Sequence, residues 1–155
     1  MGSINELINT ITVSQLLIVK GDKVWSIGPD DTVFTALEKF ADKNIGALLV
    51  MDGDRLEGIL SERDYARKVI LQGKSSMNTP VREIMTAKVI TVSPTHTLGD
   101  CMEQMTNSHI RHLPVVQNDQ VVGLISIGDI VKAVISQQEF VIEQLENYIA
   151  GERSQ

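Results

Sequence analysis

The sequence lacks several features that define large classes of protein. It has a single cysteine, Cys101, so no disulfide can form within the chain, and this usage fits a reducing cytoplasm. No apolar run approaches the roughly 20 residues that a membrane-spanning helix needs. The N-terminus also lacks the basic region and apolar run of a secretory signal. We therefore expect a cytoplasmic protein with no membrane partner.

The chain also has few aromatic residues and no basic surplus. Aromatic residues make up 4% of it, and the formal net charge is −6 at pH 7. Nucleic-acid binders normally present a basic face, and single-strand binders add aromatic residues for base stacking. We therefore expect no nucleic-acid partner. Basic residues do gather in one stretch, which is usually a solvated helix face but could also hold a phosphate: Arg63, Arg67, Lys68 and Lys74.

What the chain does have is an internal repeat. Shifted by 65 residues, Ile27–Ile70 falls on Val92–Ile135 without a gap, and 12 of the 44 aligned positions are identical. The chain has 155 residues, of which 43% are hydrophobic and 22% charged, which fits a globular protein of one ordinary domain or of two small modules that share a core. Such a duplication predicts a pseudo-symmetric pair, and a ligand commonly binds where two modules meet.

Each repeat predicts the order strand, helix, strand, strand, helix, and therefore a mixed α/β (α+β) fold. In the first repeat we expect these elements at Val24–Ile27, Val33–Asn44, Ala47–Met51, Leu56–Leu60 and Ser61–Leu71. In the second repeat we expect them at Val89–Val92, Thr97–Ser108, Leu113–Val116, Val121–Ile125 and Ser126–Ser136. Pro114 is compatible with its strand, because the start of a strand need not donate to the ladder.

The repeats divide the chain into five segments. We expect a lead-in with an N-terminal helix at residues 1–23, the first repeat at 24–72, a polar linker at 73–88, the second repeat at 89–136 and a C-terminal helix at 137–155. Both terminal helices show apolar stripes that cover the core or a partner subunit. Gly151 is expected to end the C-terminal helix. The stripes consist of Ile4, Leu7, Ile8 and Ile11 in the first helix, and of Phe140, Leu145, Tyr148 and Ile149 in the second.

One motif closes the third strand of each repeat. It is Gly-Ile-Leu-Ser-Glu-Arg-Asp at Gly58–Asp64 and Gly-Leu-Ile-Ser-Ile-Gly-Asp at Gly123–Asp129. A hydroxyl and a carboxylate three residues apart at a helix start fit a capping box, in which each side chain bonds the other residue's backbone. The same groups fit a ribose-phosphate site, because a carboxylate can accept hydrogen bonds from both ribose hydroxyls. Both interpretations remain open at the level of local sequence.

These motifs resemble those of a known family. Together with the paired strands Ala47–Val50 and His112–Val115 and the helix starts at Thr32 and Thr97, they are similar to tandem cystathionine-β-synthase-type domains, the CBS pair or Bateman module. The resemblance spans about Val24 to Ile135, and the run from Ser61 to Ser76 is similar to stand-alone bacterial CBS pairs and their plant organellar relatives. It implies one Bateman module of two pseudo-symmetric CBS repeats with additional terminal helices.

The resemblance further implies that adenosine nucleotides bind in two clefts between the repeats, each built crosswise from both. The ligand would be AMP, ADP, ATP or NAD(H), with no metal beyond a nucleotide-associated Mg²⁺. The aspartates would hold the ribose, and the strand residues would enclose the adenine. One site would use Ser61, Arg63 and Asp64 with Val89, Ile90, Ile110, Arg111 and His112. The other would use Ser126 and Asp129 with Val24, Trp25, Ile45, Gly46 and Ala47.

The two implied clefts differ in their anion partners. Arg63, Arg111 and His112 in the first correspond to three small residues, Gly128, Gly46 and Ala47, in the second. Arginine binds phosphate through paired hydrogen bonds. We therefore predict that the Asp64 cleft prefers di- or polyphosphate ligands, including a dinucleotide such as NAD, and that the Asp129 cleft prefers AMP. The alternative is that the arginines pair with Glu62 or Asp64 at the surface.

The sequence shows no catalytic constellation. It contains no nucleophile elbow, glycine-rich phosphate loop or Ser-His-Asp order, and His109 and His112 have no neighbouring ligands that would complete a zinc site. The leading hypothesis is a non-enzymatic nucleotide sensor, acting as a homodimer on an unknown regulated protein. The alternative is an interaction module that regulates a redox enzyme such as thioredoxin, with the nucleotide secondary. Cys101 is expected to be a core residue.

Overall fold

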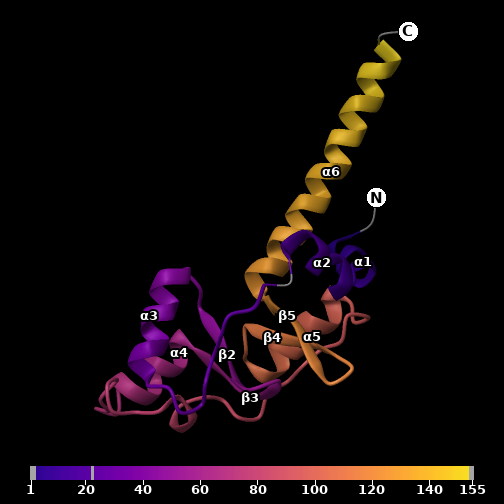
Figure 1. The fold of residues 1–155 in the computed structure, drawn as a ribbon. Helices are drawn as coiled ribbons and strands as arrows, with labels where there is room; N and C mark the ends of the chain where they lie inside the picture. The colour runs from indigo at the N-terminus through magenta and orange to yellow at the C-terminus, as the bar shows by residue number, and fades with distance from the viewer. Residues whose placement is uncertain (1–2, 22, 154–155) are drawn as a thin grey trace.

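The first repeat forms a three-stranded sheet flanked by helices (Figure 1). The computed structural model describes residues 3–21 and 23–153. The elements are β1 (Ser26–Ile27), α3 (Val33–Lys43), β2 (Ala47–Asp52), β3 (Arg55–Ser61) and α4 (Glu62–Tyr65), which continues as a π-helical segment (Ala66–Ile70). The strands lie in the order β1-β2-β3, with β1 parallel and β3 antiparallel to β2. The predicted order of elements is therefore confirmed in this repeat, although β1 is two residues long.

The second repeat reproduces this layout with one strand fewer. It contains α5 (Leu98–Ser108), β4 (His112–Gln117), β5 (Gln120–Ser126) and α6 (Ile127–Arg153). The antiparallel β2–β3 and β4–β5 pairs carry the same register shift at equivalent positions, between Val50 and Met51 and between Val115 and Val116. The duplication in the sequence is therefore matched by a duplication in the backbone geometry.

The prediction of a strand at Val89–Val92 is wrong, because the structure forms no strand there. Val92 makes only a single parallel bridge to Val115. In the first repeat the N–H of Leu49 donates to the carbonyl oxygen of Trp25 at 3.1 Å, which extends the parallel pairing. The residue equivalent to Leu49 is Pro114, which has no N–H and cannot make this bond. Pro114 is therefore compatible with the antiparallel pairing of β4 with β5, but it prevents a parallel strand from forming on the other side of β4.

The lead-in segments are exchanged between the repeats. The helix α2 (Val13–Lys20) precedes the first repeat, yet the N–H of Val13 donates to the carbonyl of His96 at 2.8 Å. A 3-10 helix (Val81–Glu83) precedes the second repeat, yet the N–H of Val81 donates to the carbonyl of Asp31 at 2.8 Å. Each repeat is thus closed by the segment that precedes the other one.

The glycine of each motif allows this exchanged segment to approach closely. A Cβ atom on Gly58 would lie 2.7 Å from the Sδ of Met85, and one on Gly123 would lie 2.8 Å from a Cδ of Leu17. Cβ atoms essentially never come this close to another atom, so a side chain at either position would force its neighbour to move. The first motif residue therefore has a packing role that the sequence alone did not reveal.

Two hydrophobic cores result, one for each repeat. Cys101 is fully buried in the second, and burial raises the pKa of its thiol to about 11, which confirms the expected core position. The first core comprises Ile27, Val33, Ala36, Phe40, Leu48, Val50, Leu60, Val69, Val81 and Ile84. The second comprises Ile8, Val13, Leu16, Val92, Leu98, Cys101, Met105, Leu113, Val115, Ile125 and Ile130.

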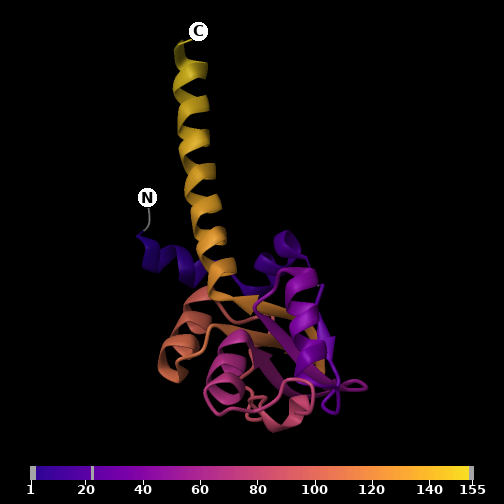
Figure 2. The ribbon, with the colours of Figure 1, turned by 90° about the vertical axis from the view of Figure 1, so that its left-hand side faces the viewer.

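The terminal helices differ from their predicted extents. At the N-terminus a short helix, α1 (Ile4–Thr10), is followed by the separate helix α2, where one helix was expected. At the C-terminus α6 is one continuous helix of 27 residues that projects from the body (Figures 1 and 2). No proline or glycine interrupts residues 129–150, and Gly151 lies inside the helix rather than ending it, since glycine also accepts helical dihedral angles at modest cost. No helix among the described residues is long and apolar enough to cross a membrane.

Candidate functional site

Both Ser-x-x-Asp motifs form helix caps. The N–H of Asp64 donates to Ser61 Oγ at 3.1 Å, and the N–H of Ser61 donates back to Asp64 Oδ2 at 3.0 Å. In the second repeat the matching bonds between Ser126 and Asp129 are 3.1 and 2.8 Å long. Each motif therefore places a serine hydroxyl and a carboxylate at the same point of its repeat, at the junction of strand and helix.

Asp64 also pairs with a cation on its own helix. Lys68, one turn further on, places Nζ 3.3 Å from Asp64 Oδ1 and donates to the carbonyl of Ile84 at 3.1 Å. The side chain of Asp64 is 15% exposed, whereas that of Lys68 is 39% exposed. The lysine thus connects the carboxylate to the exchanged segment that closes the first repeat.

Asp129 pairs with a cation from a distant part of the chain. Lys20, the last residue of α2, donates from Nζ to Asp129 Oδ2 at 2.5 Å and also donates to the carbonyl of Leu124. Burial alone would raise the pKa of Asp129, but hydrogen bonds from Lys20 and Ser126 outweigh it and hold that pKa below its usual value. Asp129 is therefore a stably ionised carboxylate at neutral pH.

His112 lies at the boundary between the repeats. A Cβ on Gly46 would lie 3.6 Å from Glu62 Oε1 and 3.9 Å from His112 Nε2, so these three residues gather at one place. The pKa of His112 is lowered, first by burial and then by the positive charge of Lys20, with Asp129 acting in the opposite direction. A neutral imidazole offers one donor and one acceptor rather than a positive charge.

The backbone connects each strand start to the motif of its own repeat. The N–H of Glu62 donates to the carbonyl of Gly46 at 3.1 Å, and the N–H of Ile127 donates to that of Arg111 at 3.0 Å. Ala47 and His112 pair in register with the serines of their own motifs. The structure therefore brings each Ser-x-x-Asp motif next to the strand start of the same repeat, whereas the resemblance assigned that strand start to the other cleft.

The apolar residues of the expected clefts lie at the edges of the cores. Trp25 and Ile45 pack against the first core, and Ile90 and Ile110 pack against the second. Two ammonium groups also make cation–π contacts with the indole ring of Trp25: Lys23 Nζ lies 4.7 Å from the ring centroid and Lys43 Nζ lies 4.4 Å from it. Of the remaining predicted residues, Ala47 is buried, and Val24 and Val89 are half-buried.

The two arginines of the first predicted cleft are exposed. Within residues 3–21 and 23–153, no ion pair involves Arg63 or Arg111, so the predicted surface pairing with Glu62 or Asp64 is not observed. Gly128, which occupies the position equivalent to Arg63, is exposed as well. Both guanidinium groups are accordingly accessible to an anion.

Asp129 opens into a groove of about 860 Å³ between α1, α2 and α6. None of the strand residues predicted for the Asp129 cleft lines this groove. Two lysines near Asp129 escaped the sequence analysis, so the difference in positive charge between the sites is smaller than the motif comparison predicts. The lining residues are Leu7, Thr10, Ile11, Gln15, Leu16, Val19, Lys20, Asp129, Lys132, Ala133, Ser136 and Gln137. No group of three or more metal-ligating side chains occurs in the part of the chain that the structure describes.

Comparison with known proteins places the chain in a family. The model of the CBS domain matches residues 13–70 and 81–136. The mitochondrial CBS domain-containing protein CBSX3 of Arabidopsis thaliana is 40% identical, over 90% of this chain and 72% of its own length. YhcV of Bacillus subtilis is 32% identical, over 70% of this chain and 76% of its own.

Solved structures give the same result. The CBS domain of NE2398 is 52% identical with a TM-score of 0.77, over 80% of this chain and 97% of its own. A CBS-domain protein of Burkholderia ambifaria named for signal transduction is 50% identical with a TM-score of 0.79, over 82% of this chain and 96% of its own. This chain, with two matched domains that exchange their lead-in segments, therefore belongs to the CBS-domain family.

Proposed function

We propose that this CBS-domain pair is a non-enzymatic regulatory module that binds an adenosine nucleotide at its Ser-x-x-Asp motifs and alters its contact with a regulated protein. The observation that carries the proposal is the duplicated ion pair. Each motif holds a largely buried carboxylate, Asp64 or Asp129, against one lysine. A nucleotide offers a binding partner to each member of such a pair: ribose hydroxyls for the carboxylate and phosphates for the ammonium group.

The chemistry of a nucleotide matches the two halves of the ion pair. The ribose diol supplies hydroxyl donors, and an ionised carboxylate offers about four acceptor positions, of which the serine and the lysine use only part. The phosphates supply negative charge for the ammonium group, Lys68 at one site and Lys20 at the other. A nucleotide can therefore satisfy both charges at once while it separates them.

Additional cations are available at both sites. Arg63 and Arg111 are exposed, and Lys132 lines the groove at Asp129. Guanidinium groups favour extended phosphate chains through paired hydrogen bonds. The backbone of Arg111 bonds the start of α6, so only Arg63 belongs to the Asp64 motif itself. We keep the prediction that the Asp64 site prefers di- and polyphosphate ligands and the Asp129 site prefers AMP, and the titration below ranks the two sites.

A signal follows from the position of Lys20. Lys20 ends α2 and bonds both Asp129 and the carbonyl of Leu124, while α2 closes the second core. A phosphate that takes over Lys20 would release the end of α2 from β5. A regulated protein with different affinity for the two arrangements of α2 would then sense the nucleotide.

The comparisons support the regulatory part of the proposal. The relatives are named for their CBS domains and, in one case, for signal transduction rather than for a reaction. The nucleotide itself is the part to be tested directly. We would follow thermal unfolding during titration with AMP, ADP, ATP, NAD, NADH and S-adenosylmethionine. A ligand at about 100 times its dissociation constant adds about 2.7 kcal/mol of stability, which raises Tm by several degrees.

The two aspartates also cap helices, so the variants need a matched control. Asp64→Asn and Asp129→Asn keep a cap acceptor but remove the charge, and each should abolish the Tm shift of its own site. Asp100→Asn makes the same change in the capping box of α5, where Asp100 and Thr97 exchange bonds of 3.1 and 2.9 Å, and should leave the ligand response unchanged.

A lack of response to every ligand, in protein shown to be free of co-purified nucleotide, would overturn the proposal. The Ser-x-x-Asp motifs would then be helix caps only. Regulation of a redox enzyme such as thioredoxin by direct contact, without nucleotide, would be the function left to examine.

A further inference from the structure

The long helix α6 has two parts with different surroundings. Its first two turns pack on the second core through Ile127, Ile130, Ala133 and Val134. Neither core cluster contains a described residue of α6 beyond Val134. Figures 1 and 2 show the rest of the helix extending away from the body of the protein. Apart from the groove that they share with α1, side chains on this outer part therefore contact neither core.

An apolar stripe follows one side of α6 and is exposed along its whole length. Its residues recur at alternating steps of four and three, which is the heptad spacing of a coiled coil. Isoleucine occupies every a position, and one d position is polar. The stripe consists of Ile135, Ile142 and Ile149 at a, and of Val131, Gln138 and Leu145 at d. The five apolar side chains are between 48% and 55% exposed, so the described residues leave about half of each side chain open to solvent.

A helix whose apolar face packs against nothing has little stability in water. Isolated helices are marginal because tertiary packing of the apolar face supplies most helical stability. Five aliphatic side chains at heptad spacing would together bury a large apolar area against a second helix.

We propose that α6 pairs antiparallel with α6 of a second copy of this chain along the seam from Val131 to Ile149. In this register Val131 lies opposite Ile149 of the second copy, Ile135 opposite Leu145, and Gln138 opposite Ile142. Every layer then pairs an a position with a d position. The inference does not rest on the proposed nucleotide site, but it uses Lys132, which also lines the groove at Asp129.

The flanks of the seam favour the antiparallel orientation. An antiparallel pair places e positions against e and g against g. Lys132 then meets Glu146 of the second copy, twice by symmetry, and the apolar g residues Val134, Val141 and Tyr148 meet one another. A parallel pair would instead place apolar g residues against Glu139 and Glu146. The antiparallel pair has one unfavourable contact, between the two copies of Glu139 at its centre.

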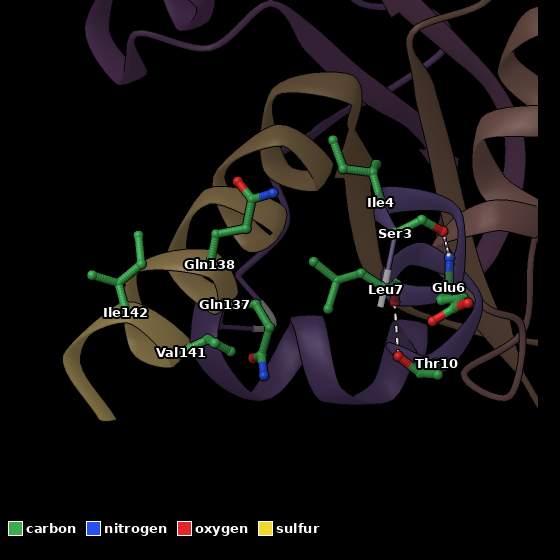
Figure 3. Close-up of a pocket in the computed structure, with 9 residues that line it drawn as sticks. All are labelled: Ser3, Ile4, Glu6, Leu7, Thr10, Gln137, Gln138, Val141 and Ile142. Carbon is green, nitrogen blue, oxygen red and sulfur yellow. Dashed lines mark hydrogen bonds between the residues drawn. The ribbon is translucent and has the colours of Figure 1, made fainter. Parts of the chain in front are cut away.

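A groove beside the seam provides room for the second helix. It has a volume of about 610 Å³ and lies between α1 and α6, and its lining includes Ile4, Leu7, Val141 and Ile142 (Figure 3). The side chain of Ile4 is 56% exposed. In the proposed register Val141 and Ile142 of the second copy come to the same level of α6. The apolar side of α1 would thus be covered by the same contact.

Disulfide cross-linking tests both the contact and its orientation. The only native cysteine, Cys101, is buried, so any disulfide between two copies must come from the engineered cysteines. Protein carrying Val131→Cys and protein carrying Ile149→Cys should each remain uncross-linked but should form a covalent heterodimer when the two are mixed and oxidised. Positions 131 and 149 lie about 27 Å apart along a helix at 1.5 Å per residue, far beyond the reach of a disulfide. Self-cross-linking of Ile149→Cys would show a parallel pair, and no cross-link in the mixture would show no pair; either result overturns the proposal.

A second measurement compares the two faces of the helix. Ile142→Asp combined with Leu145→Asp places two charges in the seam and should raise the dimer dissociation constant at least 100-fold in sedimentation analysis. Gln144→Asp combined with Asn147→Asp adds the same charges outside the seam and should leave it within threefold. Neither pair touches a core residue, so thermal unfolding of the body should stay unchanged. A seam variant that associates like the wild type contradicts the proposal.

Discussion

The two repeats hold equivalent aspartates in different ways. Asp64 in the first repeat takes its cation from its own helix, because Lys68 is four residues further along. Asp129 in the second repeat takes its cation from α2, because the position equivalent to Lys68 is Ala133 and Lys20 fills the role instead. The first site is therefore local, whereas the second joins residues 109 positions apart in the chain.

This difference gives the N-terminal segment a dual role. α2 closes the second core through Val13 and Leu16, and its last residue, Lys20, neutralises Asp129. The equivalent segment before the second repeat closes the first core through Val81 and Ile84, and contributes only the carbonyl of Ile84 to the Lys68 contact. A ligand at Asp129 would thus displace a cation that the exchanged segment itself supplies, whereas one at Asp64 would act on the exchanged segment only through the bond from Lys68 to the carbonyl of Ile84.

The largest effect is expected from the exchanged segments themselves. Leu16→Ala and Ile84→Ala each remove a buried side chain, 4% and 0% exposed, and should each lower the free energy of unfolding by about 2–5 kcal/mol in urea denaturation. Hydrogen exchange should rise in β4 and β5 for Leu16→Ala, but in β2 and β3 for Ile84→Ala. The control is Ile18→Ala on the exposed side of α2, where the side chain is 80% exposed. Faster exchange in the repeat that follows the mutated segment would contradict the exchange of segments.

The motif glycines should differ in their tolerance. A Cβ on Gly58 would lie 2.8 Å from the backbone oxygen of Thr86, as well as meeting Met85, whereas one on Gly123 would meet only the flexible end of Leu17. We expect Gly58→Ala to cost about 2–3 kcal/mol and Gly123→Ala about 1 kcal/mol in the free energy of unfolding.

A double-mutant cycle separates the two cases. Leu17→Ala should remove most of the additional cost of Gly123→Ala, because it clears the only close neighbour. Met85→Ala should relieve Gly58→Ala only in part, since the Thr86 carbonyl stays in place. An equal decrease in the free-energy cost at both glycines would show that the contact with the Thr86 carbonyl does not contribute to the cost of Gly58→Ala.

The fold was predictable where the repeat is regular in sequence. The gapless shift of 65 placed the hairpins, the helices α3 and α5 and both motifs, because apolar spacing and cap residues are local signals. The exchanged segments were missed because their match needs a shift of 68: Val13, Leu16 and Leu17 correspond to Val81, Ile84 and Met85. A search that allowed a three-residue gap would have found them.

The site was predictable only in part. The serines and aspartates are where the motif placed them, but the cation that pairs with Asp129 comes from α2. Lys20 has no local signal that marks it as a neighbour of Asp129, because tertiary packing sets this distance, whereas Lys132 lies three residues from Asp129 on the same helix. The effect of Pro114 was predicted only for one strand pair. Pro114 is compatible with the β4–β5 hairpin, but it lacks the N–H that the parallel strand before it would need.

The smallest effect, and the one that isolates the charge at the second site, is the pH dependence of Asp129. Its pKa is lower in the folded chain than in the unfolded chain, so the ionised carboxylate stabilises the fold above pH 4, and this stabilisation is lost as the pH falls through the folded pKa. Asp129→Asn should therefore lower the free energy of unfolding at pH 7 by about 1–2 kcal/mol, and the deficit should shrink as the pH falls below the unfolded pKa and vanish below the folded one. Urea denaturation at pH 7, 5 and 3 measures both values.

Two further variants assign the cause of that dependence. Lys20→Met should reproduce most of the pH 7 loss, because the Lys20 hydrogen bond is the largest of the effects that lower the pKa of Asp129. Asp54→Asn changes the same charge in an exposed turn and should leave the stability unchanged at every pH. A full pH dependence that survives Lys20→Met would instead assign the stabilisation to the cap bonds with Ser126, and the second site would then be as local as the first.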